Sequence, residues 1–522
     1  MCAAAALILA ACGRNVPSYG EPPPDLVTAD PNATATATPF QPGATVEAVV
    51  QEIIQTEVAG WTDTPAVTET STPEPASPTP TEAPATAATA PPSNNAPSGS
   101  RALYTLYTTL DYDGHAAAIN ETVRYTNNTG QSLSSVVMSV EPNQWPGCFS
   151  LAELSQDGNA LGNYDLDGHR LTIPLGRPLV PGETTTFFLG YSLDLPWKSE
   201  EGTFGYRTNQ LNLTNWYPFI VPFEGDWVLH DPSTYGEYLV YDAADFEVNI
   251  KLEDPGVVLA ASAPGEANGD GTRYHLEGAR TFVLSASDSY EMDETAVGPV
   301  LIRAYYFPGH ENANDAVVWM ATQSIGLYQA KFADYPYQSL TIVESDLNDG
   351  QEFDGLVFLA SDFYTEYNGT ARSNLVSIGT HEIAHQWWFG LVGSDQASEP
   401  WLDEALSVYS EHLFYEFNHP GYGDWWWNFR VNFFGPSGYV DQGVYGFGTF
   451  RGYVNAVYLN GANLLDELHR RVGDEAFYAF LKDYAQSYAR SRATGGDFFS
   501  VLRRHTSQDF SDIMGTYLQG QY

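Results

Sequence analysis

Residues 381–390 read HEIAHQWWFG and place two histidines and a glutamate within five positions. In an α-helix, residues four apart lie on one face about one turn apart, so His381 and His385 can each direct a ring nitrogen at one ion. Glu382 lies roughly 100° around the helix and would reach a water held by that ion instead of the ion itself. A helix with two solvated histidines would show the same five residues, so the pattern alone leaves both interpretations open.

The segment that follows favours the metal site. Eighteen residues separate His385 from Glu404, which stands in SEPWLDEALSVYSE, and this spacing allows a loop and a second helix to return a carboxylate to the ion. Two neutral imidazoles and one carboxylate leave a fourth tetrahedral position for water, which is the catalytic zinc arrangement. Glu411, seven residues further on the same helix face, is a candidate to hydrogen-bond the far nitrogen of a ligating histidine. A solvated surface carboxylate would fit that spacing equally.

This combination resembles the aminopeptidase N group of zinc metallopeptidases, whose catalytic domain is thermolysin-like. The resemblance is carried by His381, Glu382 and His385, by the spacer, and by PWLDEA around Glu404, where the family usually reads Trp-Leu-Asn-Glu-Gly. It extends more loosely over residues 101–522 through NLTNWYPFIVPFEGDW and FADYPYQSLTIVES. The resemblance implies one zinc ion per chain, bound by the two histidines and Glu404, with Glu382 as the catalytic base.

Two further site residues follow from the resemblance. Tyr458, in VYLNGANLL, stands where the family's Tyr-x-x-Gly supplies a phenol to the oxyanion, although a tyrosine packed at a helix start would look the same. Glu352, in DGQEFDGLV, stands where the Gly-x-Met-Glu-Asn motif supplies the carboxylate that binds the free amino terminus of the substrate. Gln351 replaces the methionine of that motif and Phe353 its asparagine. An ordinary loop carboxylate therefore stays open as an alternative for Glu352.

The first residues indicate a targeting signal. AAAALILAACG is an apolar stretch too short to span a bilayer, and it ends in small residues. LAAC resembles the bacterial lipobox, so we expect residues 1–12 to be a lipoprotein signal peptide with a lipidated Cys12. No Lys or Arg precedes the apolar stretch, which departs from the pattern and leaves simple secretion as the alternative. The sequence predicts an extracytoplasmic protein, anchored to the bacterial cell membrane through the lipid on Cys12.

The rest of the chain divides into three segments. Residues 13–100 are rich in Pro, Thr and Ala and cannot bury enough apolar surface to fold, so we expect a disordered tether. Residues 101–295 contain alternating runs such as FEVNIKLEDP, which predict an all-β sandwich or saddle-shaped domain. Longer helical patterns dominate residues 296–522, as in LDEALSVYSEHLFYEF. The expected fold is multidomain α+β, with the β domain followed by a thermolysin-like, mostly helical catalytic domain.

The net charge of the chain limits the classes of molecule that we expect it to bind. The formal net charge is -43, from 65 acidic against 22 basic residues, and such a surface repels phosphate backbones, so nucleic acid is not expected as a partner. The sequence favours a zinc-dependent peptidase that hydrolyses peptide substrates with a metal-activated water, releasing N-terminal residues as an aminopeptidase does. A zinc endopeptidase with the same site is one alternative. A catalytically silent, zinc-containing surface binding protein is the other.

Overall fold

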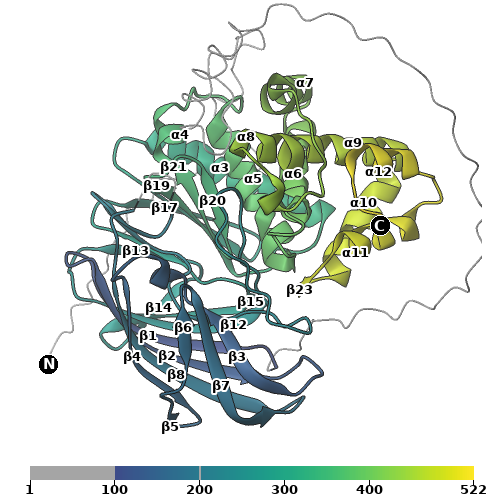
Figure 1. Ribbon diagram of the computed structural model, residues 1–522. Helices are drawn as coiled ribbons and strands as arrows, with labels where there is room; N and C mark the ends of the chain where they lie inside the picture. Colours follow the sequence, from purple (N-terminus) through teal and green to yellow (C-terminus); the bar gives the residue numbers. More distant parts are fainter. Residues whose placement is uncertain (1–99, 199–201) are drawn as a thin grey trace, which may run out of the picture.

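The computed structural model describes residues 100–198 and 202–522 (Figure 1). The predicted signal peptide at 1–12 with Cys12 lies outside the described residues, as does the predicted tether at 13–100 apart from its last residue. In the described part, no helix combines the length and the apolar character needed to cross a membrane. The predicted multidomain α+β fold is confirmed: a β-rich first part is followed by a part that becomes helical towards the C-terminus.

An eight-stranded sheet forms the base of the β-rich part (Figure 1). In β12, buried Phe246, Val248 and Ile250 alternate with more exposed residues, as the sequence pattern predicts. In spatial order the strands are β14 (Gly265–Asn268), β15 (Gly271–Ala279), β12 (Ala244–Leu252), β1 (Leu103–Asp111), β2 (Ala116–Thr126), β8 (Thr184–Asp194), β4 (Phe149–Gln156) and β5 (Asn159–Ala160). All neighbours pair antiparallel except β1 and β12, which run parallel.

Two four-stranded sheets complete this part, and their buried residues share one hydrophobic core with the large sheet. The first consists of β11 (Phe219–Ile220), β3 (Leu133–Ser139), β7 (Arg170–Leu179) and β6 (Asp165–Asp167). The second consists of β13 (Val258–Ala261), β16 (Leu284–Ser287), β10 (Gln210–Leu213) and β9 (Gly205–Arg207).

A five-stranded mixed sheet connects the two parts. In order it contains β17 (Glu291–Val297), β18 (Val300–Tyr306), β19 (Ser339–Ser345), β21 (Leu356–Ala360) and β20 (Gly350–Phe353). β17 includes residue 296, the predicted start of the catalytic domain. The sequence analysis did not predict this sheet. β19 and β21 are buried along their whole length, so their sequences lack the alternation that marks a half-buried strand.

Helices α5 and α6 pack against each other, and α5 also lies against β20. The α-helices are α3 (Glu311–Lys331), α4 (Ser361–Thr365), α5 (Asn374–His385), α6 (Trp401–Asn418), α7 (Gly423–Trp426), α8 (Phe450–Tyr453), α9 (Asn460–Val472), α10 (Asp474–Ser487), α11 (Gly495–His505) and α12 (Ser511–Tyr517). The 3-10 and π-helical segments are η2 (Glu141–Gln144), η3 (Gln386–Leu391), η4 (Trp427–Val431), η5 (Asn432–Phe434), η6 (Val444–Gly446) and η7 (Val454–Leu459). Short strands β22 (Val392–Gly393) and β23 (Ser491–Arg492) pair in parallel.

The buried Arg280, directly after β15, fixes the β-rich part to the helical part. Its Nε donates a hydrogen bond to the carbonyl oxygen of Phe389 (2.7 Å) and its Nη2 to that of Ser491 (2.7 Å). Its Nη1 donates to the carbonyl oxygen of Tyr241 (2.9 Å), ahead of β12. One guanidinium thus satisfies three buried carbonyl groups from both parts of the chain.

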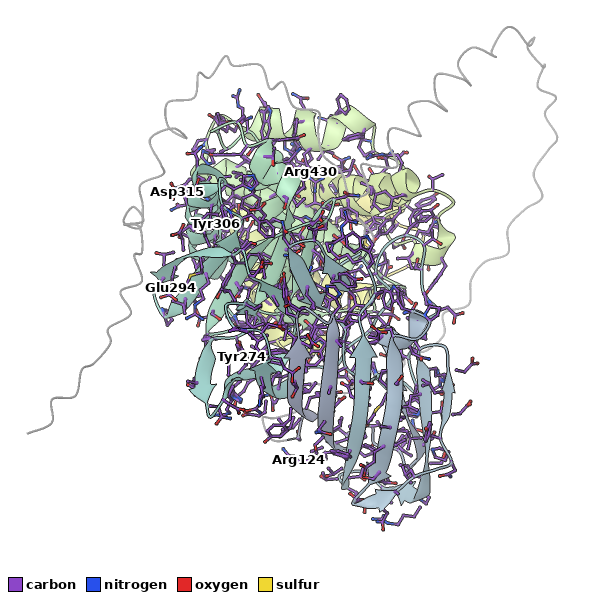
Figure 2. All side chains as sticks on the ribbon, turned by 90° about the vertical axis from the view of Figure 1, so that its left-hand side faces the viewer. Arg124, Tyr274, Glu294, Tyr306, Asp315 and Arg430 are labelled. Atoms are coloured by element: carbon purple, nitrogen blue, oxygen red, sulfur yellow. The ribbon has the colours of Figure 1, made fainter. Side chains whose placement is uncertain are left out.

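Figure 2 shows the two parts from the side. Arg430 lies in the upper part, among the helices, whereas Arg124 and Tyr274 lie lower, on the eight-stranded sheet. The helices, β20, the segment between β11 and β12 and the loop between β19 and β20 contribute residues to the cavity in which the predicted site residues meet.

Candidate active site

Helix α5 presents His381 and His385 to the interior. Its first turn is capped by Ser373, whose hydroxyl oxygen accepts a hydrogen bond from the N–H of Val376 (3.4 Å). Both histidines are buried, and their Nε2 atoms are 3.0 Å apart. Two ring nitrogens directed at one point in this way have the arrangement of two ligands to one ion.

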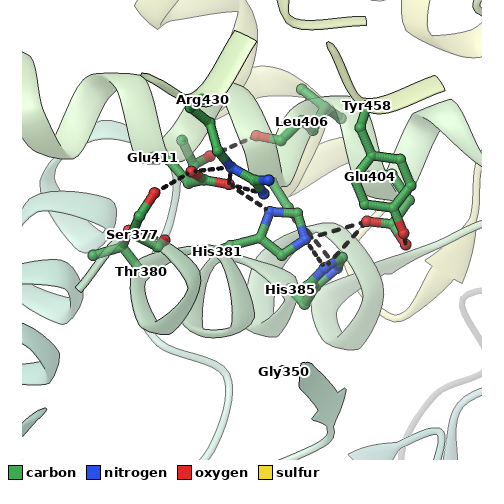
Figure 3. Close-up of polar contacts among 12 residues, drawn as sticks. Gly350, Ser377, Thr380, His381, His385, Glu404, Leu406, Glu411, Arg430 and Tyr458 are labelled. Atoms are coloured by element: carbon green, nitrogen blue, oxygen red, sulfur yellow. Dashed lines mark hydrogen bonds and ion pairs between the residues drawn. The ribbon is translucent and has the colours of Figure 1, made fainter. Parts of the chain in front are cut away.

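Helix α6 brings Glu404 to the same point from its first turn (Figure 3). Its Oε2 lies 3.2 Å from Nε2 of His381 and 3.6 Å from Nε2 of His385. In a tetrahedral zinc site with bonds of about 2.0–2.2 Å, ligand atoms are separated by about 3.3–3.6 Å. The observed separations of 3.0, 3.2 and 3.6 Å lie within or close to that range, so these three residues fit a zinc ion.

The far nitrogen of each histidine faces a buried carboxylate. Nδ1 of His381 lies 3.0 Å from Oε1 of Glu411, and Nδ1 of His385 hydrogen-bonds Oδ1 of Asp403. These carboxylates favour a proton on Nδ1, which leaves the lone pair of each Nε2 directed at the shared point. The structure places Glu411 at the position the sequence analysis considered. It adds Asp403, to which the sequence analysis gave no role.

Glu411 is held by several donors besides His381 (Figure 3). Its carboxylate accepts hydrogen bonds from Ser377 Oγ (2.8 Å), Trp426 Nε1 (3.1 Å) and Nη2 of the buried Arg430 (2.8 Å). Burial alone would raise the pKa of the Glu411 carboxylate. The charge of Arg430 and the bond to His381 outweigh this effect and hold the pKa at about 2. Glu411 is therefore an anion and a fixed acceptor for the histidine ring.

Glu382 lines a cavity of about 490 Å³ together with the three metal-fitting residues. Gly350 of β20 lies so close to the Glu382 carboxylate that a Cβ atom there would overlap it. Only glycine allows this approach. Burial, partly offset by His381, raises the pKa of Glu382 to about 8, and the higher proton affinity suits a general base.

Tyr458 lies in η7, immediately before α9, and lines the same cavity. Its hydroxyl donates a hydrogen bond to Oε1 of Glu404 (2.5 Å). Its ring lies parallel to the His381 ring, with the ring centroids 6.0 Å apart. The phenol thus reaches the point at which the ligands converge, where it can donate a hydrogen bond to a bound substrate.

Glu352 of β20 opens on the cavity and meets a second carboxylate, Glu237. The side-chain amide of Gln351 donates to both, to Oε2 of Glu352 (2.8 Å) and to Oε1 of Glu237 (2.5 Å). Among the described residues, Oε1 of Glu352 has no hydrogen-bond partner. Desolvation raises the pKa of Glu237 to about 7 and that of Glu352 well above its usual range, and neighbouring carboxylates add to both shifts. The pair is suited to a cationic group.

The sequence analysis missed Glu237, which lies in an irregular segment between β11 and β12 that has no periodic pattern or motif. Gln351, which replaces the methionine of the family motif, has a role in the structure. Its side-chain amide can bridge two carboxylates, which the thioether of methionine cannot do. Gln396 extends the bridge by donating to Glu237 and to Oδ2 of Asp403 (2.7 Å). Ligand atoms of Glu237, Glu352 and Asp403 lie within 4.8 Å of one another.

The converging ligand atoms, the adjacent carboxylate and the phenol form a centre that fits a metal ion and supplies the side chains that metal-dependent hydrolysis requires. No protein-family model matches the chain. Among solved structures, the fold resembles that of the M1 zinc metallopeptidase of Deinococcus radiodurans. The TM-score is 0.59 at 17% identity, over 81% of this chain and 94% of that one.

The names of the curated relatives that match the sequence agree with the structural similarity. Aminopeptidase N of Lactococcus lactis subsp. lactis is 26% identical over 231 residues, and aminopeptidase M1-B of Oryza sativa subsp. japonica is 25% identical over 235 residues. These matches cover 40% and 42% of this chain and 27% of each relative, so the chain spans about a quarter of the length of the curated relatives it matches. The chain is thus similar in sequence to members of the aminopeptidase N group and in fold to an M1 zinc metallopeptidase, in agreement with the resemblance of its motifs.

We expect Glu411→Gln to weaken zinc binding by about 10–100-fold, because the amide is a poorer acceptor for the His381 ring. The zinc dissociation constant, measured by competition with a chelator, checks this. Glu416→Gln is the matched control, since Glu416 lies on the same helix and is exposed. Equal zinc affinity in the Glu411 variant and the wild type would show that the contact does not support the ligand.

Proposed function

We propose that the protein is a zinc-dependent aminopeptidase. One observation carries the proposal: a single cavity of about 490 Å³ contains both the metal-fitting residues and the Glu237–Glu352 pair. The first peptide bond and the α-ammonium group of one substrate can therefore be bound at the same time. The names of the relatives support this activity. A mutant of the Deinococcus radiodurans enzyme has been crystallised bound to Tyr-Ser-Ala substrate, which supports short peptides as the substrate class.

The reaction divides between the metal and the side chains around it. When bound by His381, His385 and Glu404, zinc supplies Lewis acidity that polarises the carbonyl group and makes a water molecule acidic. Glu382 reaches the cavity beside these ligands and accepts the proton of the attacking water. The same carboxylate then delivers a proton to the leaving amine, so it serves both halves of the hydrolysis.

Two further contacts position the substrate. The Tyr458 phenol donates a hydrogen bond to the oxyanion that develops on the carbonyl oxygen. Glu237 and Glu352 form charge-assisted hydrogen bonds with the α-ammonium group. The fixed spacing between this pair and the metal-fitting residues places only the first peptide bond at the reacting point.

We expect Glu382→Gln to lower kcat by about 10²–10⁴, because the amide cannot accept the proton. Zinc content should stay at one ion per chain, since Glu382 is not a ligand. Steady-state hydrolysis of a leucyl-coumarin substrate, with metal analysis of the same samples, measures both quantities. Glu475→Gln, on the exposed face of α10, is the control for the loss of one carboxylate. Wild-type kcat in the Glu382 variant would remove this residue from the mechanism.

The proposal is tested with aminoacyl-coumarin substrates and their N-acetyl forms, with and without chelator. We expect chelator-sensitive cleavage of the free-amine forms alone, because acetylation removes the charge that Glu237 and Glu352 bind. Glu352→Gln should lower kcat/KM for the free-amine forms by at least about tenfold. Equal cleavage of both forms would indicate an endopeptidase. Bound zinc without cleavage of either form would indicate a binding protein.

We further propose that a lipid on Cys12 anchors the protein outside the cytoplasm, which the lipobox-like LAAC supports. In a bacterial host, the full chain should partition into the detergent phase of a Triton X-114 extract, and the Cys12→Ser chain into the aqueous phase. Recovery of the wild-type chain from the aqueous phase would contradict the lipid anchor.

A further inference from the structure

The proposed amino-terminus site and the metal-fitting residues come from different parts of the chain. Glu237 lies in the segment between β11 and β12, whereas His385 ends α5. Because Glu237 is outside the helices and strands, no regular backbone ladder fixes its position relative to the histidine. Side-chain contacts must therefore set the spacing that decides which peptide bond reaches the metal.

Gln396 supplies such a contact. Its Nε2 donates one hydrogen bond to Oε2 of Glu237 and another to Oδ2 of Asp403 (2.7 Å). The reverse orientation would direct the amide oxygen at two carboxylates, so only one orientation of the amide is favourable. Gln396 is 4% exposed, and water has little access to compete for these bonds. The amide thus joins a carboxylate of the β-rich part to one of the helical part.

Asp403 has the acceptors that this arrangement needs. Its Oδ1 hydrogen-bonds Nδ1 of His385, and its Oδ2 accepts the bond from Gln396. An asparagine, which the family motif has at this position, carries only one acceptor oxygen. It could serve the histidine, but its NH2 group could not accept a second bond from an amide. The carboxylate therefore lets one residue orient a metal-fitting histidine and hold Gln396.

The residue before Gln396 holds the same segment at a second point. Asp395 hydrogen-bonds Nε2 of His230 (2.9 Å), which lies seven residues before Glu237. Asp395 is itself fixed by hydrogen bonds from the N–H (3.1 Å) and the hydroxyl (3.0 Å) of Ser398. The segment that carries Glu237 is thus held in place from the helical part, and Gln396 holds the carboxylate itself.

We propose that Gln396 positions Glu237 for the α-ammonium group of the substrate and thereby sets the distance from that group to the metal. This inference rests on the proposed aminopeptidase function and adds a residue that determines its selectivity for a free amino terminus. Gln396 is not among the described residues that line the metal cavity. It therefore acts through Glu237 and not on the reacting atoms.

Gln396→Met keeps the length of the side chain and removes the amide donor. With the zinc-loaded full chain and leucyl-coumarin, we expect KM to rise by about tenfold and kcat to stay within about threefold of wild type, because one hydrogen bond to a charged group is lost. The zinc dissociation constant, measured by competition with a chelator, should stay within about threefold, since Asp403 keeps its bond to His385. Gln508→Met, at an exposed position after α11, is the matched control and should keep the wild-type values.

A double-mutant cycle separates positioning from a general loss of stability. In the Glu237→Gln background, Gln396→Met should change KM by less than about twofold, because the carboxylate that it positions is gone. Asp403→Asn tests the other end of the contact. It should raise KM as Gln396→Met does, with zinc retained, and the two changes together should raise KM no further. This variant decides the question even if Gln396→Met does not fold.

The outcomes separate the inference from the proposed function. Wild-type KM in the Gln396 variant, or an undiminished effect in the Glu237→Gln background, overturns the inference and leaves the aminopeptidase intact. A loss of zinc affinity with unchanged KM would assign Gln396 to the metal centre and also overturn the inference. Absence of wild-type cleavage of any free-amine substrate overturns the proposed function and the inference with it.

Discussion

Two buried carboxylates, Asp403 and Glu411, orient the two histidines that fit a metal ion, and the geometry of the whole site depends on them. A buried carboxylate is costly unless hydrogen bonds satisfy it, so each demands a fixed set of donors. Glu411 takes its donors from α5 and from the segment after α6, and it also forms an ion-pair contact with His381. Asp403 takes them from His385 and Gln396. These contacts hold α5 against α6 and keep the two Nε2 atoms close to Glu404.

The same chemistry explains why the site is suited to cations at several points. Carboxylates enclosed within a few ångströms of one another repel, and protein groups relieve that repulsion only in part. Arg430 offsets Glu411, and the amides of Gln351 and Gln396 hold Glu237 between its neighbours. A metal ion and a terminal ammonium group are two ligands that lower the energy of the same acidic interior.

Local spacing made part of this site predictable from the sequence. His381, His385, Glu404 and Glu411 lie at helical separations within two helices, and helix geometry alone sets which of them share a face. Glu237 and Arg430 come from segments without a regular period, so no spacing rule leads from them to the histidines. The five-stranded sheet was missed for a related reason, because strands buried on both faces carry continuous apolar runs. The fold class was accessible because the half-buried strands of the β-rich part, such as β12, do alternate.

The three hydrogen bonds of Arg280 affect which parts of this chain can change in sequence. In the proposed reaction, α5, α6 and η7 contribute the metal-fitting residues, the base and the phenol, whereas Glu237, proposed to bind the amino terminus of the substrate, comes from the β-rich part. Arg280 joins the β-rich part to the helical part through hydrogen bonds to backbone carbonyl groups, which every amino acid carries. The loop that bears Glu237 is therefore free to change its side chains without disturbing the joint. Substitutions in this loop can therefore change the proposed amino-terminus site while the metal-fitting residues keep their positions.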